Sequence, residues 1–219
     1  MGCLFAGLLL WCLHPWLLTR LGRSLIAGDS VRSVDVLLVL DGRPGYEFAE
    51  HLLSEGQAGQ LLLFDKVHSR VVELGVLPTS IDLCRDLVEE LHIPVRQVAE
   101  LPGQMTHLDQ LLDSALRHLG PEQTLAVVCS EWRSAYVRVK LSRAATRNHC
   151  TRPLLFLVDD PEADPENWWQ TRHGIRLVCD QLMRCTSLRL AAETHDASPI
   201  SAEQFRRAAV ATHEAPPSE

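Results

Sequence analysis

A nearly unbroken apolar run, residues 34–40, stops abruptly at Asp41 and Gly42. With a single polar interruption, this is the pattern of a β-strand buried on both faces, followed by a loop. Pro44 then suits the first turn of a helix, and apolar residues recur at helical spacing over positions 48–53. A buried strand, a tight turn and a helix, in this order, are the usual beginning of an open α/β sheet. Ligands of such sheets lie beyond the carboxyl ends of the strands.

The same alternation continues along the chain. Further apolar runs of strand length lie at residues 60–65, 97–101, 125–130 and 154–158. Between and after them, helical patterns are predicted at residues 68–75, 78–91, 106–120 and 131–145, and from 166 to beyond 190. In the third of these helices, Thr106 and Asp109 have the spacing of a capping box, with Asp in place of the usual Glu. We therefore predict an α/β fold with a mainly parallel open sheet of about five strands and helices on both faces.

Composition limits the function classes. The 219 residues allow one sizeable α/β domain with appendages, and 46% hydrophobic residues suffice for its core. The formal net charge is −7, and no Lys/Arg run breaks the acidic balance. A nucleic-acid binder normally carries a basic face. We therefore expect no nucleic-acid partner.

The N-terminal segment is strongly apolar. Residues 3–18 carry no charge, although a His-Pro pair breaks the run, and about 20 apolar residues are needed to span a bilayer. Three interpretations compete: a membrane anchor, a hydrophobic helix docked on the domain, or a signal peptide. We favour an anchor in the inner (plasma) membrane, with the side that the domain faces left open. The domains expected are residues 1–28 as anchor or docking segment, 29–193 as the α/β domain and 194–219 as a mobile tail.

Cysteine and histidine spacing argues against a metal centre. No two of the seven cysteines form a CxxC pair, and none of the ten histidines belongs to an HExxH pattern. The cysteines are predicted to be free and mostly buried. Asp159, Asp160 and Asp164 could bind a metal, but an acidic loop before a helix is equally a solvated N-terminal cap. We predict no metal site, and the sequence names no cofactor.

Polar residues follow every predicted strand. They are Asp41-Gly42-Arg43, Asp65-Lys66, Glu100, Ser130 with Arg133, and Asp159-Asp160. Because the carboxyl ends of parallel strands meet at one edge, these groups could share a crevice. The plainer interpretation is that Asp, Ser and Gly end strands in any α/β protein. The GxGxxG, GxxxxGK[ST] and GxSxG patterns are absent, so no specific chemistry follows from motifs.

Several segments together resemble the bacterial YdcF/SanA/ElyC-like family, known chiefly as a domain of unknown function. They are an apolar N-terminal segment ending in Pro, residues 34–42, Ser-Glu-Trp-Arg-Ser-Ala at 130–135, and Trp-Trp-Gln-Thr-Arg-His-Gly-Ile at 168–175. The resemblance extends over roughly residues 10–190. It implies a Rossmann-like α/β sheet, anchoring in the inner membrane and a role in envelope or peptidoglycan homeostasis.

The chain departs from the family's pattern at its polar positions. The Tyr-His pair usual after the fourth strand is Trp132-Arg133 here, and the Ser-Gly pair that ends the second strand is Phe64-Asp65. The family's acid–Thr–acid–amide pattern is kept only in part, which adds Thr106 to the candidates. Replacing a titratable histidine with a permanently charged guanidinium removes acid–base catalysis at that position but favours anion binding.

Three functions remain open. The first is a membrane-associated protein of the cell envelope that binds a small anionic or phosphorylated ligand. The second is a hydrolase or transferase acting on a cell-wall or lipid-linked intermediate, with Asp41, Asp65 or Glu100 as base or metal ligand and Ser130 nearby. The third is a purely structural partner of envelope machinery, in which the crevice has no function. We favour binding, and protein partners are not indicated. The candidate ligand-binding residues are Asp41, Gly42, Arg43, Asp65, Lys66, Glu100, Thr106, Ser130 and Arg133.

Overall fold

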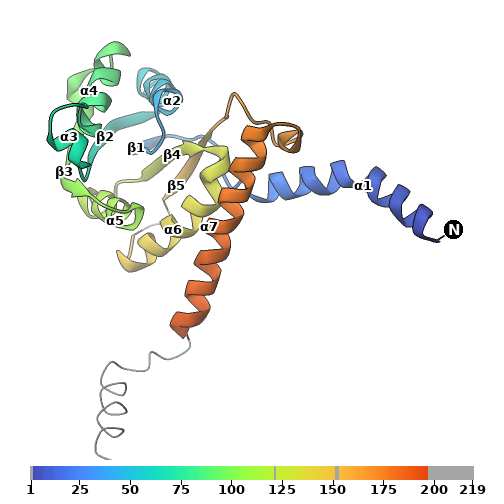
Figure 1. The fold of residues 1–219 in the computed structure, drawn as a ribbon. Helices are drawn as coiled ribbons and strands as arrows, with labels where there is room; N and C mark the ends of the chain where they lie inside the picture. Colours follow the sequence, from blue (N-terminus) through green and yellow to red (C-terminus); the bar gives the residue numbers. More distant parts are fainter. Residues whose placement is uncertain (1, 121, 151–152, 197–219) are drawn as a thin grey trace, which may run out of the picture. The chain divides into compact units, whose positions relative to one another are not determined.

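Five parallel strands form one open sheet at the centre of the fold (Figure 1). The computed structural model describes residues 2–120, 122–150 and 153–196, and side chains are described from residue 13 to 188 within these ranges and at residue 190. The strands are β1 (Val34–Val39), β2 (Ala58–Lys66), β3 (Val98–Met105), β4 (Leu125–Ser130) and β5 (Leu154–Val158). Their order is β3-β2-β1-β4-β5 and every neighbouring pair is parallel. The predicted parallel α/β fold, of Rossmann-like type, is confirmed.

Helices cover both faces of the sheet. On one face, α2 (Arg43–Ser54) and α4 (Ser80–Glu90) pack against alternate residues of the central strands, such as Leu37 and Leu61. On the other, α5 (Leu108–His118) and α6 (Ser134–Arg147) pack against the residues that point the opposite way, such as Leu38 and Leu62. All four of these strand leucines have no more than 1% of their surface exposed. The unbroken apolar strand pattern thus reflects burial on both faces.

The residues that mark the two ends of α2 and the start of α4 lie where the sequence predicts. Pro44 lies in the first turn of α2, and Gly56 just beyond its end has φ of 69°, a left-handed conformation that favours glycine. Helix α4 begins with a capping box, in which Thr79 and Asp82 each accept a hydrogen bond from the other's backbone N–H. The short α3 (Arg70–Glu73) precedes it.

Several boundaries differ from the sequence prediction. β3 runs to Met105 rather than ending near residue 101, so Glu100 lies within the strand. Thr106 does not cap α5: the N-cap residue is His107, and Thr106 donates instead to the side-chain oxygen of Gln110. The last helix, α7 (Arg172–Asp196), begins later than expected, after the 3-10 turn Trp168–Gln170.

The described cysteines form no disulfide, as predicted; they are Cys84, Cys129, Cys150, Cys179 and Cys185. Only Cys129 among them is buried, because it alone lies inside a strand, so the prediction that most are buried is wrong for this set. Cys3 and Cys12 lie outside the described side chains.

The N-terminal segment is helix α1 (Gly2–Ser24), whose second half contacts the loop before α7. The indole Nε1 of Trp168 donates to the carbonyl of Leu18 at 3.0 Å. Gly22 lies so close to this indole that a Cβ there would stand 2.8 Å from Nε1. Among the described residues, no helix combines the length and the apolar character needed to cross a membrane.

A short strap, residues 25–29, follows α1 and runs to the edge strand β5. Its Leu25 carbonyl accepts from the backbone of Ala135, and its Ala27 N–H donates to the hydroxyl of Ser134. Asp29 donates its N–H to the carbonyl of Leu155 at 2.8 Å and accepts the N–H of Leu155 on its carboxylate at 2.9 Å. The strap therefore occupies backbone groups that an edge strand would otherwise leave open.

We expect Asp29→Ala to lower the free energy of unfolding by about 1–3 kcal/mol. The substitution deprives both the Leu155 N–H and the half-buried Arg138 guanidinium, 2.7 Å from the carboxylate, of an acceptor. Asp29→Asn keeps a neutral acceptor oxygen and should cost clearly less. Urea unfolding measures both variants, and equal losses would contradict this account of the strap.

By its internal contacts the chain divides into two units, Met1–Gln181 and Leu182–Glu219. The sheet and all the contacts given above belong to the first unit. Of the second unit, α7 continues as helix to Asp196. Most of the segment predicted to be a mobile tail, residues 197–219, lies outside the described residues.

Candidate functional site

The carboxyl edge of the sheet has its topological switch point between β1 and β4, because the chain passes from β1 to β2 on one side and β4 to β5 on the other. Asp41 lies directly after β1 at this point. One of its carboxylate oxygens accepts the backbone N–H of Ser130 at the end of β4, and the other pairs with the guanidinium of Arg133. This Asp41–Arg133 pair bridges the two strand ends and fixes the direction of the arginine.

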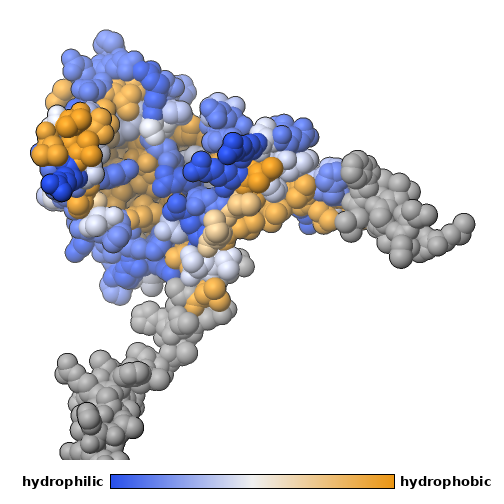
Figure 2. Space-filling model, viewed as in Figure 1, coloured by the Kyte–Doolittle hydropathy of each residue, from blue (hydrophilic) through white to orange (hydrophobic). Residues whose placement is uncertain are grey.

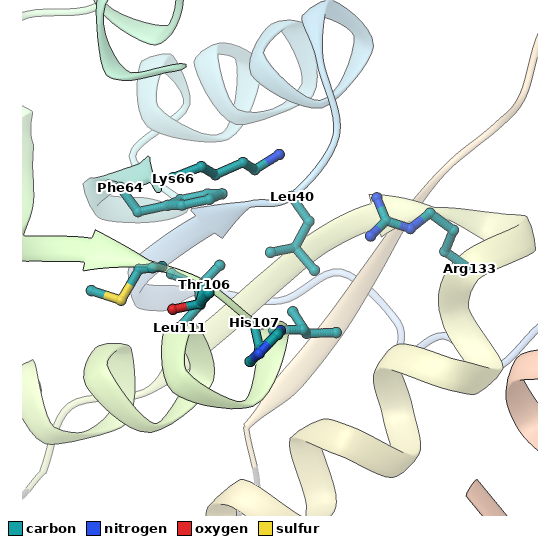
Figure 3. Close-up of a pocket in the computed structure, with 9 residues that line it drawn as sticks. Leu40, Phe64, Lys66, Thr106, His107, Leu111 and Arg133 are labelled. Carbon is teal, nitrogen blue, oxygen red and sulfur yellow. The ribbon is translucent and has the colours of Figure 1, made fainter. Parts of the chain in front are cut away.

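Three hollows surround the pair. Hollow A, of about 150 Å³, lies between Lys66, Arg133 and the start of α5 (Figure 3). Hollow B, of about 440 Å³, lies between α2, the end of β2 and α4 and includes Asp41 in its lining. Hollow C, of about 280 Å³, is lined by Asp41, Ser130 and Arg133 on one side and by the loop of Asp159 and Asp160 on the other.

Hollow A combines an apolar floor with positively polarised walls. Its floor includes Leu40, Phe64, Met105, Leu108 and Leu111. Its polar lining consists of Lys66, Thr106, His107 and Arg133, so its only permanently charged groups are two cations. Figure 3 shows Lys66 and Arg133 on opposite sides of Leu40, with Thr106 and His107 at the start of α5.

The start of α5 adds to this polarity. The N-cap residue His107 makes no side-chain hydrogen bond to the first-turn N–H groups of the eleven-residue helix. Such N–H groups, together with the helix dipole, favour a negative charge at this end. The two cations of hollow A thus lie on the same cavity as the positive end of a helix.

A cluster of hydrogen-bonding side chains lies beside the end of β2. Asp65 accepts from the Ser80 hydroxyl at 2.8 Å and lies 2.8 Å from Nε2 of His68. Burial opposes ionisation of Asp65, but the hydrogen bonds from Ser80 and His68 outweigh it and lower the pKa of Asp65. Serine and histidine bind opposite oxygens of one carboxylate here, so the histidine is not placed to remove the serine's proton as in a catalytic triad.

Six of the nine predicted site residues line one or more of the three hollows. These are Asp41, Gly42, Lys66, Thr106, Ser130 and Arg133. No one of the three hollows is lined by more than three of the nine residues, so these strand-end residues are divided among three hollows and do not share the single crevice that the sequence suggested.

The other three lie elsewhere. Arg43 is exposed on α2 and pairs with Glu90 and Glu47, away from the hollows. Glu100 is within β3, where Arg85 binds both its oxygens at 2.8 Å and lowers the pKa of Glu100. Asp65 belongs to the cluster with Ser80 just described.

Several lining residues were not predicted. His107 was missed because it falls inside the helix predicted at residues 106–120, where a histidine is expected to face solvent, whereas in the structure it is the N-cap residue of α5 and lines hollow A. Tyr46 and Cys84 line hollow B from α2 and α4, and burial raises the pKa of both side chains. Cys84 falls on the apolar side of the helix predicted at residues 78–91, and no pattern in the sequence distinguishes either residue from the core.

Fold and site together define an open parallel α/β protein with a cationic hollow at its switch point. Comparisons with protein-family models, with curated proteins and with solved structures find no match. The family resemblance noted from the sequence therefore stays a prediction. In the part of the chain that the structure describes, no three His, Cys, Asp or Glu side chains are grouped to hold a metal ion.

Proposed function

We propose that this protein binds a small anionic ligand, carrying a phosphate or carboxylate group, in hollow A. The observation that carries the proposal is the placement of Arg133 on this hollow by its bond to Asp41. A guanidinium keeps its charge at all physiological pH values and presents several N–H donors in one plane, which suits phosphate and carboxylate groups. Lys66 and the start of α5 supply further positive potential.

Binding is better supported than hydrolysis or group transfer. Each carboxylate considered as a base already has strong partners: Asp41 pairs with Arg133, Asp65 with Ser80 and His68, and Glu100 with Arg85. The hydrogen bonds to Asp65 and Glu100 stabilise their ionised forms and lower the pKa of both side chains, which makes these two carboxylates weaker bases. A role as general base at neutral pH would call for the opposite, a raised pKa.

The cellular setting that we propose is the bacterial envelope, with membrane association through the N-terminal segment. This part rests on the sequence resemblance and on the apolar character of residues 3–18. It is independent of the ligand site and does not affect the test below.

We expect Arg133→Met to weaken binding of inorganic phosphate by about tenfold to a hundredfold, the range of a hydrogen bond to a charged group. The phosphate affinity of Arg133→Lys should lie between those of the parent protein and Arg133→Met, because lysine keeps the charge but loses the planar set of donors. Isothermal titration calorimetry or phosphorus NMR measures the dissociation constants.

The matched control is Arg147→Met. Arg147 lies at the other end of α6, pairs with Asp113 and lines none of the three hollows. Arg147→Met should leave the affinity for phosphate unchanged. If Arg133→Met and Arg147→Met have the same affinity, the assigned site is wrong.

A further inference from the structure

Hollow B adjoins hollow A and differs from it in character. Leu40, Phe64 and Lys66 line both, so the two cavities share a wall at the ends of β1 and β2. The remaining lining of hollow B is mainly apolar and includes Tyr46, Leu83, Cys84 and Leu87. Its volume, about 440 Å³, lies within the range of small-molecule sites. In Figure 2, apolar surface is visible between the hydrophilic rims on this side of the molecule.

The charges are divided unequally between the two cavities. The charged side chains on hollow A are Lys66 and Arg133, both cations. Hollow B instead carries two carboxylates, Asp41 and Asp86, besides the shared Lys66. An anionic group would be repelled by these carboxylates in hollow B and attracted in hollow A. An apolar group, by contrast, gains by displacing water from the leucine-lined walls of hollow B.

We propose that the ligand is an amphiphile, with its phosphate or carboxylate head in hollow A and an unbranched apolar tail in hollow B. The inference rests on the proposed function and adds the chemical class of the ligand. The wall shared by the two cavities fixes the order: the head lies against Arg133 and the start of α5, and the tail passes Leu40 and Phe64 toward Leu83 on α4.

The first test titrates the full-length protein with inorganic phosphate and with butyl, hexyl and octyl phosphate, all below their micelle-forming concentrations. Each buried methylene should tighten binding about fourfold, or about two-hundredfold from butyl to octyl. Hexanoate and octanoate form a second arm, and the tighter series identifies the head group. If phosphate binds and chain length has no effect, the inference is overturned while the proposed function stands. If neither phosphate nor any alkyl anion binds, both fail.

The second test locates the apolar tail of the ligand in hollow B. Leu83 lines hollow B and has 51% of its surface exposed, so Leu83→Ser should leave the fold intact. This variant should lose at least about threefold in octyl phosphate affinity, while its affinity for inorganic phosphate stays unchanged. The matched control is Leu74→Ser, which makes the same chemical change at a residue that is 69% exposed and lines neither hollow. Equal effects of the two variants on octyl phosphate would overturn the assignment to hollow B.

The half-buried thiol of Cys84 gives a direct readout of occupancy, because it lines hollow B. Octyl phosphate should slow alkylation of Cys84 by N-ethylmaleimide, followed peptide by peptide in a mass spectrometer. Exposed Cys179 on α7 serves as the internal control and should react at an unchanged rate. Slower reaction of Cys84 with octyl phosphate but not with phosphate supports the inference, and an unchanged rate with saturating octyl phosphate overturns it.

Discussion

Replacing Trp132 with alanine is expected to lower the free energy of unfolding by about 3–5 kcal/mol, the usual cost of removing a buried large aromatic side chain. Trp132 is completely buried, and it is the largest such side chain in the described core. Its indole Nε1 donates to the carbonyl of Ala163 at 2.9 Å, which holds the loop after β5 against the turn that carries Arg133. Urea unfolding monitored by circular dichroism measures the loss.

Two further variants separate the effect of the side chain's size from the effect of its position in the fold. Trp132→Phe keeps most of the ring volume but leaves the Ala163 carbonyl without its donor, so a loss of about 1–3 kcal/mol is expected. Trp16→Ala removes an indole that is 54% exposed on α1 and should change stability little. A Trp132→Ala protein as stable as the Trp16→Ala protein would show that the loop does not depend on this anchor.

The second large effect expected is a dependence of stability on pH that is caused by Glu131. This side chain has only 8% of its surface exposed. Burial raises the pKa of Glu131 to about 7, and the nearby carboxylates of Asp159, Asp160 and Asp164 contribute to the rise. The backbone N–H of Asp160 opposes it in part.

The direction of this pH dependence follows from the number of protons that the folded and the unfolded chain bind. Between about pH 4.3, where an unfolded glutamate ionises, and pH 7, the folded chain holds a proton that the unfolded chain has lost. Stability therefore falls as pH rises through this window, by up to about 4 kcal/mol in all, and the penalty is constant above it. Glu131→Gln has no carboxylate to ionise and should lack this contribution.

We therefore expect Glu131→Gln to be more stable than the parent protein at pH 8 and nearly equal to it at pH 4.5. Melting temperatures of both proteins across this range give the difference, in which contributions from other titrating groups cancel. Glu89→Gln, at an exposed position of α4, is the control for the same chemical change at the surface. A difference between Glu131→Gln and the parent that does not change with pH would contradict the prediction.

The sheet could be predicted from the sequence because each strand is buried on both faces. A run such as Leu61, Leu62 and Leu63 has few alternatives when it ends at polar residues and is followed by a helix. Boundaries were less predictable where strand and turn residues mix. The third strand was predicted to end at residue 101, yet pairing with β2 continues past Pro102 and Gly103 to Met105, with a register shift on the way.

The candidate site could be predicted only in part. Residues such as Asp41 and Ser130, directly at strand ends, follow from topology alone. Which charges pair depends on side-chain reach, and this is not encoded in spacing: Arg43 folds back onto Glu90, whereas Arg133 extends to Asp41. The apolar hollow B could not be predicted, because leucines that line a cavity and leucines that fill a core have the same helical pattern.

The Asp41–Arg133 pair has a consequence for how the protein exists without a ligand. A guanidinium beside a cavity destabilises the empty site when it has neither water nor a counter-ion. The side chain of Arg133 is 38% exposed and also carries its own counter-ion, Asp41, directly after β1. The fold therefore does not need a bound anion to balance this charge, and the anion that we propose would have to compete with a resident carboxylate for the guanidinium. Its occupancy would then follow the concentration of the anion rather than the state of the fold.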